Sequence, residues 1–454
     1  MTLYIIGFIV VFLLVLASGL PVGFGLGFLA LGLMTAYTDF DMAMSMGIEK
    51  AYASLDSSVL VAVPLFILAA QLISETGMGK RLFDAAKAFL GRFKSGLGIA
   101  TIASSGVFSA MTGSSFVSAS TMGLIAIPEL RKAKYSDALI SAAITAGGSL
   151  GSVIPPSIVM IVYGYLTDES IGKLFMAGMI PGFLLIFLYS FALMLFSKKS
   201  IGQETPEETP AAWERPNFLK TAESVGACAA VAEEAPMTRR VALKEAFWGL
   251  MAPVIILGGI YIGIFTASEA AAIASIYCIF IGYVFYRTLN LKKLWNVLMS
   301  AGNLSAMVAV IIIGGAMLGH VVVFGRIPQQ ILEHIIAQNY HPVLLLILVN
   351  LLLFVLGMFL EVLALMYLAI PLLFPLVLHM DWNNVWFAVI LLINVNLALI
   401  TPPMGGVLYI VSQIGAIPIN TVLKGAILPV AILILVLILV IVFPPIATWL
   451  PSLM

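Results

Sequence analysis

A cluster of hydroxyl groups interrupts an apolar stretch at residues 109–118, whose sequence is SAMTGSSFVS. The hydroxyls gathered around Gly113 are those of Thr112, Ser114 and Ser115. Hydroxyl and carbonyl oxygens are hard ligands that suit a dehydrated alkali cation, whereas soft ligands select other metals. This segment therefore favours a cation site. The alternative is close packing of small residues between helices, which better explains Ser104, Ser105 and Ser118.

Two similar segments, far apart in the chain, each contain a double proline. Residues 144–157 have the sequence ITAGGSLGSVIPPS, and residues 393–406 have the sequence INVNLALITPPMGG. A proline pair inside a helix removes two backbone donors and clashes with the preceding turn, so it breaks the helix. In lipid an unmet polar group costs several kcal/mol, so such backbone must line a cavity or bind something. A packed structural kink is the alternative at each place.

Glu361 is the one carboxylate that we expect inside the hydrocarbon region, at the end of the segment LGMFLE, residues 356–361. An ionisable group in such a place is a candidate functional residue. Three roles stay open: holding a cation, carrying a proton, or accepting hydrogen bonds from a neighbouring helix. His320 also falls in an apolar run, but a lone histidine there is more typical of packing.

The surroundings of these residues indicate a membrane protein. The 454 residues are 62% hydrophobic and only 10% charged, whereas soluble domains are about a quarter charged. Apolar runs near the length needed to cross the roughly 30 Å hydrocarbon core recur along the chain. They include Leu3–Leu20, Pro21–Tyr37, Val59–Ile73, Leu174–Phe196, Phe247–Phe265 and Ala426–Phe443. The first run has no basic flank or cleavage site, which predicts a retained helix.

Basic clusters predict the topology by the positive-inside rule. We expect the cytoplasmic face to hold the clusters at residues 80–94, 131–134, 198–244 and 287–293. The crossings then agree with the charges if two segments, 98–130 and 343–377, are helical hairpins that enter and leave on one side. Ten full spans and two hairpins place both termini outside. Residues 41–55 and 289–299 have helical spacing that indicates surface helices, with ordinary loops as the alternative.

This topology divides the chain into two membrane repeats. The first occupies residues 1–200, with a hairpin at 98–130 and a broken helix at 135–166. A polar, charged cytoplasmic linker follows at 201–242. The second repeat occupies residues 243–454, with a hairpin at 343–377 and a broken helix at 384–412. The two double-proline helices run in opposite directions, so the fold class predicted is all-α and polytopic with an inverted repeat.

Other functional classes fit the sequence poorly. With 22 basic and 22 acidic residues the net charge is zero, so no nucleic-acid surface is expected. Gly79 and Lys80 lack the spacing of a phosphate-binding loop, which disfavours an ATP-driven pump. The hydroxyl cluster has no nearby histidine or aspartate for a hydrolase, and polarity confined to two breaks disfavours a channel. Cys228 and Cys278 are expected to be unpaired thiols, and we expect no enzyme activity.

Five motifs together resemble the large membrane subunit, the DctM-like M subunit, of TRAP (tripartite ATP-independent periplasmic) transporters. They are PLFILA at residues 64–69, TGSS at 112–115, GSLGSVIPPS at 148–157, GMIPG at 178–182 and ITPPMG at 400–405. Each motif is weak alone, but the five in this order are specific, and the resemblance covers nearly the whole chain. The departures are the insertion at 203–240 and the acidic second tip at Glu361.

The resemblance implies an elevator-type carrier driven by Na+ that works with a small four-helix membrane subunit and a periplasmic binding protein. It also implies a small organic-acid substrate, such as a C4-dicarboxylate, keto acid or sialic acid, and a place in the bacterial inner membrane. An alternative is a proton- or sodium-coupled anion carrier that works without a binding protein.

By the same resemblance, sodium ions lie where each hairpin tip meets its broken helix. The residues expected there are Thr112, Gly113, Ser114, Ser115, Gly148, Gly151 and Pro155 for the first tip, and Gly357, Met358, Glu361, Thr401, Pro402 and Gly405 for the second. The substrate is expected between the tips, at Ser114, Ser115, Ser157, Glu361 and Gly406.

Overall fold

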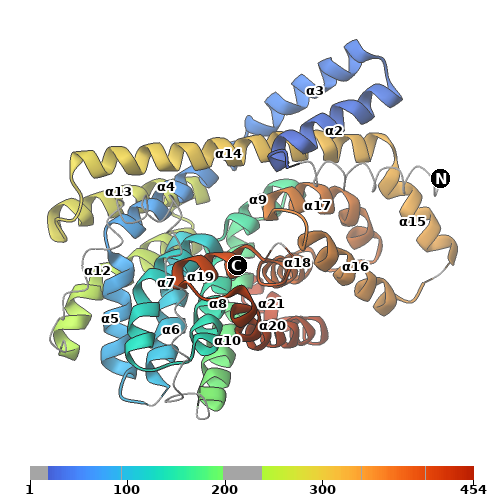
Figure 1. Ribbon diagram of the computed structural model, residues 1–454. Coiled ribbons are helices and arrows are strands. Elements are labelled where there is room, and N and C mark those ends of the chain that lie inside the picture. Colours follow the sequence, from blue (N-terminus) through green and yellow to red (C-terminus); the bar gives the residue numbers. More distant parts are fainter. Residues whose placement is uncertain (1–18, 94, 198–237, 339, 404) are drawn as a thin grey trace.

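The computed structural model describes residues 19–93, 95–197, 238–338, 340–403 and 405–454, and every regular element among them is a helix (Figure 1). In these ranges, 7 helices are long and apolar enough to cross a membrane, or up to 8 if a bent pair counts as one span. The first expected span, Leu3–Leu20, and most of the expected linker lie outside the described residues. The count of ten crossings stays a prediction.

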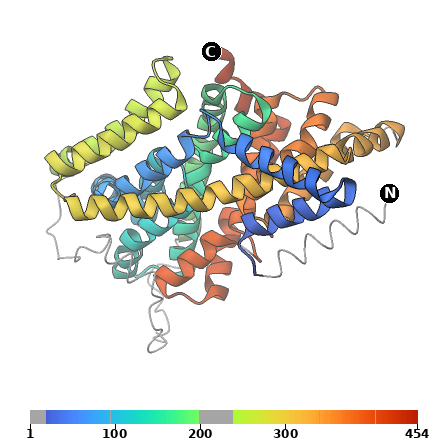
Figure 2. The same cartoon turned by 90° about the horizontal axis from the view of Figure 1, so that it is seen from above.

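A long helix crosses the bundle on one side. Helix α14 (Leu291–Phe324) has 34 residues and runs across the direction of the other long helices (Figures 1 and 2). It packs against α2 (Val22–Tyr37), α3 (Phe40–Leu55) and α4 (Ala62–Glu75). Both expected surface segments are helical, but residues 289–299 are not a separate helix. From Leu291 they continue as one helix to Phe324, because no proline interrupts it.

The first hairpin and the first broken helix have nearly the predicted bounds. Helix α4 bends by 61° into α5 (Met78–Leu90), at Gly77 with a φ of 73°. The hairpin is α6 (Gly96–Thr112) and α7 (Ser115–Lys132), compared with the predicted 98–130. The broken helix is α8 (Asp137–Val153) and α9 (Ile158–Thr167), compared with 135–166. Helix α10 (Ile171–Ser197) follows.

The second half has the same order of elements. Helix α12 (Arg239–Tyr261) begins inside the last residues of the expected 201–242 linker, and α13 (Ala267–Phe280) and a π-helical turn, η1 (Ile281–Phe285), lead to α14. After α15 (Ile327–Gln338) come the hairpin α16 (Pro342–Gly357) and α17 (Val362–His379), and then the broken helix α18 (Asn384–Leu399) and α19 (Gly406–Gly415). Helix α20 (Ile419–Val442), α21 (Pro445–Thr448) and η2 (Pro451–Leu453) end the chain.

Backbone conformations repeat between the halves. A left-handed residue lies between α4 and α5 and between α14 and α15. Others lie at each junction between a hairpin and its broken helix, and after each half-helix. The pairs are Gly77 and Arg326, Lys134 and Asp381, and Asp168 and Ala416. The Pro155–Pro156 and Pro402–Pro403 bonds are both cis. Left-handed non-glycine residues are uncommon, so their matched positions confirm the internal repeat. The predicted all-α fold, with an inverted repeat, two hairpins and two broken helices, is correct.

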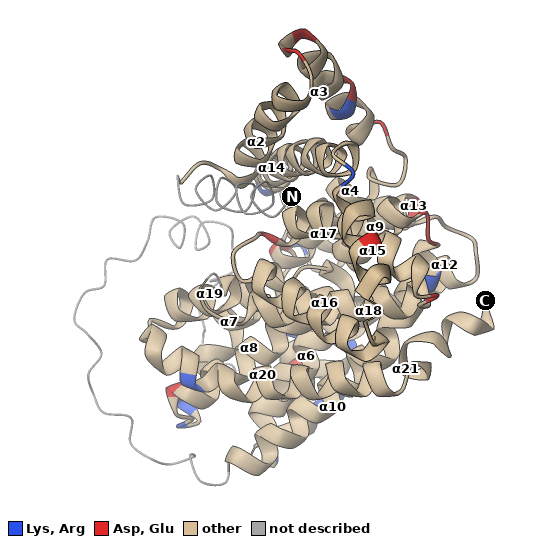
Figure 3. Cartoon of the chain, turned by 90° about the vertical axis from the view of Figure 1, so that its right-hand side faces the viewer, with Lys and Arg blue, Asp and Glu red and all other residues tan. Residues whose placement is uncertain are grey.

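The two broken helices form the centre of the molecule. Nearly every residue of α8 and α18 is buried, whereas most residues of α10 are not. Helix α8 packs against α6, α7 and α20, and α18 packs against α16 and α20. Charged residues lie mainly near helix ends and in loops, and few of them belong to this centre (Figure 3). Pro155 and Pro156 are therefore enclosed by protein, whereas Pro402 and Pro403 are exposed on the surface of the chain.

Candidate functional site: two hairpin tips at two broken helices

The tip of the first hairpin is built on a glycine that no other residue can replace without strain. Helix α6 ends at Thr112, and Gly113 adopts a left-handed conformation with a φ of 62°. A β-carbon on Gly113 would lie 2.5 Å from the carbonyl oxygen of Pro156. Ser114 then turns the chain and caps α7 by accepting a hydrogen bond from the backbone N–H of Val117 at 3.5 Å. The tip therefore inserts directly against the first proline break.

Gly151 brings the other side of the break against the same tip. A β-carbon there would lie 2.5 Å from the carbonyl of Ser114 and from the backbone nitrogen of Ser115. The peptide group between the two serines thus lies on the surface of α8. Because only glycine permits this approach, the sequence of α8 is fitted to the tip. The structure brings together Gly113, Ser114, Ser115 and Gly151, as predicted.

A buried chain of polar side chains joins this tip to both broken helices. The hydroxyl oxygens of Ser115 and Ser152 are 2.9 Å apart, and the Ser152 hydroxyl donates to Oδ1 of Asn396 at 2.6 Å. Asn396 in turn donates to the carbonyl of Leu392 at 2.8 Å. All three linked side chains are buried. Since Ser152 donates to the amide, the Ser115 hydroxyl must be the donor to Ser152.

Ser157 is the free hydroxyl of the first break. It follows Pro156 directly, is fully buried, and its Oγ has no hydrogen-bond partner. Buried polar groups are nearly always hydrogen-bonded, so an unpartnered hydroxyl beside freed backbone is suited to a ligand. Thr112 differs, because its hydroxyl donates to the Phe108 carbonyl at 3.1 Å and lies 3.2 Å from that of Ser118. Its side chain serves the hairpin's own packing.

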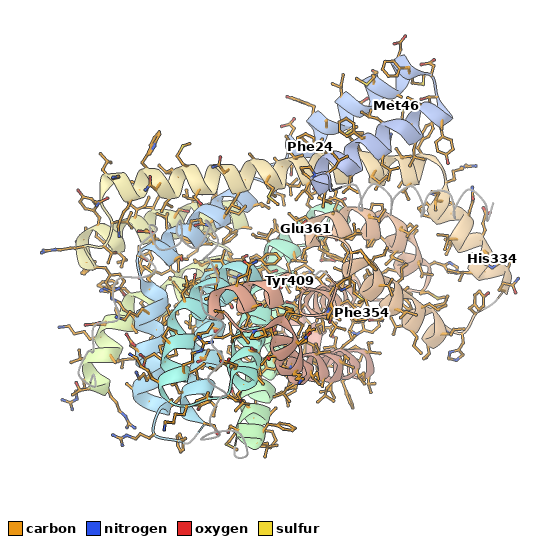
Figure 4. The ribbon with its side chains drawn as sticks, in the orientation of Figure 1. Phe24, Met46, His334, Phe354, Glu361 and Tyr409 are labelled. Carbon is orange, nitrogen blue, oxygen red and sulfur yellow. The ribbon has the colours of Figure 1, made fainter. Side chains whose placement is uncertain are left out.

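The second tip is built differently. Glu361 is the N-cap of α17, and its Oε2 accepts hydrogen bonds from the N–H groups of Leu363 at 2.9 Å and Ala364 at 3.4 Å. The carboxylate is therefore held by its own helix, and not by a neighbouring one as one sequence alternative suggested. Figure 4 shows Glu361 over the middle of the molecule, whereas His334 lies at its edge. A carboxylate has about four acceptor sites, more than the N–H donors of Val362, Leu363 and Ala364 occupy.

The second tip also lies against its broken helix. A β-carbon on Gly357 would lie 2.7 Å from that of Ala398, in the last turn of α18. Met358 ends α16 beside it. The Thr401 hydroxyl donates back to the Leu397 carbonyl at 2.6 Å, so its lone pairs remain available. After Pro402 and Pro403 the chain restarts at α19, with Gly405 at a φ of 28°.

The first tip touches the second break as well. A β-carbon on Gly406 would lie 2.6 Å from the ring of Phe116, and one on Gly148 would lie 2.7 Å from Ala119 and 3.3 Å from Val407. Gly148 therefore serves helix packing between α8, α7 and α19. The half-helices restart at Ile158 and Gly406, which lie two residues after Pro156 and three residues after Pro403. Their N-termini carry the partial positive charge of a helix dipole.

Sequence reasoning missed the asparagines of this region. Asn394 donates to Oδ1 of Asn350 at 2.7 Å, which ties α18 to the second hairpin, while Asn396 faces the first repeat. Both lie in the INVN segment, where two amides in an apolar run were a detectable signal. Residues 98–130, 135–166, 343–377 and 384–412 contain no Lys or Arg. Any negative charge bound here must be balanced by helix termini, N–H groups or bound cations.

Comparison with known proteins agrees with this geometry. The profile of the family described as "Tripartite ATP-independent periplasmic transporter, DctM component" matches residues 9–446. The chain belongs to this TRAP transporter family. The resemblance stated from the motifs is thereby confirmed, and the protein is a multi-pass TRAP large permease component.

Named relatives support this assignment along the whole chain. The sialic acid TRAP transporter large permease protein SiaM of Vibrio cholerae is 36% identical over 440 residues, which are 96% of each chain. The sialic acid TRAP transporter permease protein SiaT of Haemophilus influenzae is 34% identical, over 98% of this chain and 68% of that one. The C4-dicarboxylate TRAP transporter large permease protein DctM of Vibrio cholerae is 32% identical, over 96% of this chain and 95% of that one.

Among solved structures, the YdaH transporter of Alcanivorax borkumensis has a similar fold. Its TM-score is 0.51 at 15% sequence identity, over 84% of this chain and 86% of that one. At this identity the likeness concerns the fold alone.

Proposed function

We propose that this TRAP permease imports a small organic acid by coupling its movement to sodium. The observation that supports this proposal best is the buried, unpartnered hydroxyl of Ser157 beside the first hairpin tip. A first sodium ion would be held by oxygens of Gly113, Ser114, Ser115 and Ser157, with the Gly151 and Pro155 region as the facing wall. These are neutral hard donors, which suit an alkali cation.

A second sodium ion would lie at the second break. Its ligands would be drawn from Glu361, Thr401 and the backbone near Gly357 and Gly405. The unused acceptor capacity of the Glu361 carboxylate and the unshared lone pairs of Thr401 support this assignment. A carboxylate makes this site anionic when empty, so the two sites would differ in cation affinity.

The substrate would lie between the tips, near the N-termini of α9 and α19. Relatives are named for sialic acid and C4-dicarboxylates, which are organic acids, and helix N-termini favour bound carboxylates. Contacts from Ser114, Ser115, Ser157, Glu361 and Gly406 are proposed. A periplasmic binding protein would deliver the acid, and a small four-helix membrane subunit would complete the carrier in the bacterial inner membrane.

Transport would follow an elevator mechanism. The hairpins and broken helices, residues 98–166 and 343–412, would move as one body within the repeats 1–200 and 243–454. The remaining helices would form the scaffold, with the segment 201–242 as a cytoplasmic linker and both termini in the periplasm. The burial of nearly all of α8 and α18 supports movement as a unit.

The test is uptake into proteoliposomes that contain both membrane subunits and the loaded binding protein. Radiolabelled sialic acid, succinate and a 2-keto acid are offered with an inward sodium gradient, with potassium instead, or with a proton gradient. We expect uptake of one class of acid only with sodium. Uptake driven by protons alone, or undiminished without the binding protein, would favour the alternative anion carrier.

A pair of variants tests the sodium site itself. Ser157→Ala removes the unpartnered hydroxyl at the break, and Ser105→Ala removes another fully buried, unpartnered hydroxyl on α6. A lost ligand in a dry site costs about 1–3 kcal/mol, so Ser157→Ala should raise the half-saturating sodium concentration about tenfold or more. Ser105→Ala should not change it. Equal sodium dependence in both variants and the wild type would exclude Ser157 as a ligand.

A further inference from the structure

Two groups of polar contacts join the repeats at the ends of the broken helices remote from the prolines. The first, the Arg131 clasp, consists of Arg131, Asp137 and Gly415. The Arg131 guanidinium donates to the Gly415 carbonyl at 2.6 Å and lies 3.3 Å from the Asp137 carboxylate. It thereby ties the junction of α7 and α8 to the last residue of α19, which belongs to the other repeat.

The second group, the Asn384 clasp, consists of Tyr163, Glu169 and Asn384. The Asn384 side chain donates to Oε2 of Glu169 at 2.9 Å and accepts a hydrogen bond from the Tyr163 hydroxyl. That hydroxyl also lies 3.2 Å from the Asn384 carbonyl. This clasp ties the first residue of α18 to the end of α9 in the first repeat.

The two clasps are related by the internal repeat. In each, the start of one broken helix and the residues around it hold the end of the half-helix from the other repeat. Each held half-helix ends at a left-handed residue, Asp168 after α9 and Ala416 after α19. The side chains differ completely, since one clasp is an arginine–carboxylate pair and the other an amide–phenol–carboxylate group. The shared feature is the place that is held.

The position of the clasps determines what they can do. Each half-helix has its N-terminus at a proline break, where no continuous helix fixes its direction. Besides the packing along its sides, the polar contacts at its other end fix its tilt. Arg131 also places its positive charge at the C-terminus of α19, where cations are favoured. The repeats are therefore linked at three places: by the Arg131 clasp, by the Asn384 clasp, and by the hydrogen bond from Ser152 to Asn396 near the breaks.

We propose that Arg131 and Asn384 are positioning residues that lock the two broken helices into one body, so that the two sodium sites bind cooperatively. The inference rests on the proposed sodium coupling, but the clasps act on geometry whether or not sodium drives transport. Loss of one clasp frees the outer end of one half-helix. The break at its other end then holds its oxygens less firmly, and occupation of one site no longer prepares the other.

The first measurement is independent of transport. In a chain with Cys228→Ala and Cys278→Ala, spin labels are placed at Ala133 and Gln413 across the Arg131 clasp, or at Ser170 and His379 across the Asn384 clasp. All four label positions are exposed. Pulsed electron paramagnetic resonance gives each distance distribution. Arg131→Gln should broaden the first distribution and leave the second narrow, and Asn384→Ala should do the reverse.

The second measurement is sodium-dependent uptake by the reconstituted transporter. Each variant should raise the half-saturating sodium concentration about fivefold, the equivalent of about one hydrogen bond, and lower the Hill coefficient toward one. Lys132→Gln is the matched control for Arg131, because Lys132 pairs with Glu129 on its own helix. Asn383→Asp is the control for Asn384, because aspartate keeps the α18 cap. Arg131→Lys, which keeps the charge, should restore part of the cooperativity.

The outcomes separate the two proposals. Broadened distances with a reduced Hill coefficient, absent in the controls, support the clasps. Broadened distances in the two variants, together with wild-type uptake that needs no sodium, would support the clasps as positioning devices and overturn the proposed coupling. Narrow distributions in both variants, or an unchanged Hill coefficient despite broadening, would overturn the clasp proposal. If Arg131→Gln does not fold, Arg131→Lys and Asn384→Ala decide by the same criteria.

Discussion

Replacing Ser152 with alanine tests whether the buried polar chain at the breaks organises the cation site. The Ser152 hydroxyl is the middle member of this chain, between Ser115 at 2.9 Å and Asn396 at 2.6 Å. Alanine removes the hydroxyl and keeps the helix, because alanine is the best helix former. The first tip then loses its side-chain link to the second repeat, while no residue proposed as a ligand is changed.

The magnitude follows from burial. Two hydrogen bonds disappear at about 1 kcal/mol each, and the Oδ1 of Asn396, on a fully buried side chain, is left without its donor. Together these losses amount to about 2–3 kcal/mol. About 1.4 kcal/mol corresponds to a tenfold change in affinity. If half of the loss falls on the cation-bound state alone, the half-saturating sodium concentration should rise about tenfold.

The assay is sodium-dependent uptake in proteoliposomes, combined with thermal unfolding of the purified complex with and without sodium. Ser104→Ala is the control, because Ser104 is equally buried but its hydroxyl bonds only to the carbonyls of Ala100 and Thr101 in its own helix. A double-mutant cycle with Asn396→Ala gives the coupling energy directly, expected at about 1 kcal/mol.

Two results would refute the reasoning. If Ser152→Ala and Ser104→Ala have the same sodium dependence and the same unfolding temperature, the chain does not organise the site. If the double variant with Asn396→Ala shows no coupling, the 2.6 Å contact contributes no energy and the tip is held by its backbone contacts alone.

Further substitutions test single features. Gly113→Ala places a β-carbon 2.5 Å from the Pro156 carbonyl oxygen at a φ of 62°, so it should abolish uptake. Gly32→Ala is the control, because a β-carbon at Gly32 would meet nothing within 4 Å, and it should leave uptake unchanged. Both are measured by uptake assays on equal amounts of protein. Glu361→Gln should raise the half-saturating sodium concentration, because a neutral side chain can keep the α17 cap but not the charge, and wild-type sodium dependence would limit Glu361 to capping. Tyr189→Phe removes a buried 3.0 Å contact with Ser149 and should lower the free energy of unfolding by about 1 kcal/mol without changing sodium affinity, measured by unfolding and uptake together.

The sequence allowed the hairpins and broken helices to be predicted closely because their markers stand out in apolar surroundings. Single prolines such as Pro181 and Pro429 lie inside continuous helices. Two adjacent prolines remove two backbone donors and break a helix, so the breaks at Pro155 and Pro402 could be located without knowing the packing. The hydroxyl tip around Gly113 was visible for the same reason. In contrast, the continuity of α14 was not predicted, because a change in composition near residue 300 resembles an element boundary although no helix-breaking residue is present.

The contacts between repeats could not be predicted in this way. Ser152 and Asn396 are 244 residues apart, and Arg131 and Gly415 are 284 apart. Such pairs are set by three-dimensional packing rather than by local propensity. The sequence also could not distinguish adjacent serines: Ser114 caps a helix, whereas Ser115 joins the buried chain. Both are serines in the same short tip, and only the direction of each side chain in the folded protein separates their roles.

Symmetry and asymmetry in this chain have different physical sources. The matched features are all backbone features, namely the two proline breaks and the left-handed residues such as Asp168 and Ala416. The side chains at corresponding places differ: the first tip offers neutral hydroxyls, and the second offers the Glu361 carboxylate. A repeated backbone can place two hairpin tips at two broken helices in equivalent positions, but it cannot by itself make the two places bind ions differently. The difference in charge between the tips must therefore decide any order of binding, while the clasps decide whether the two events are coupled.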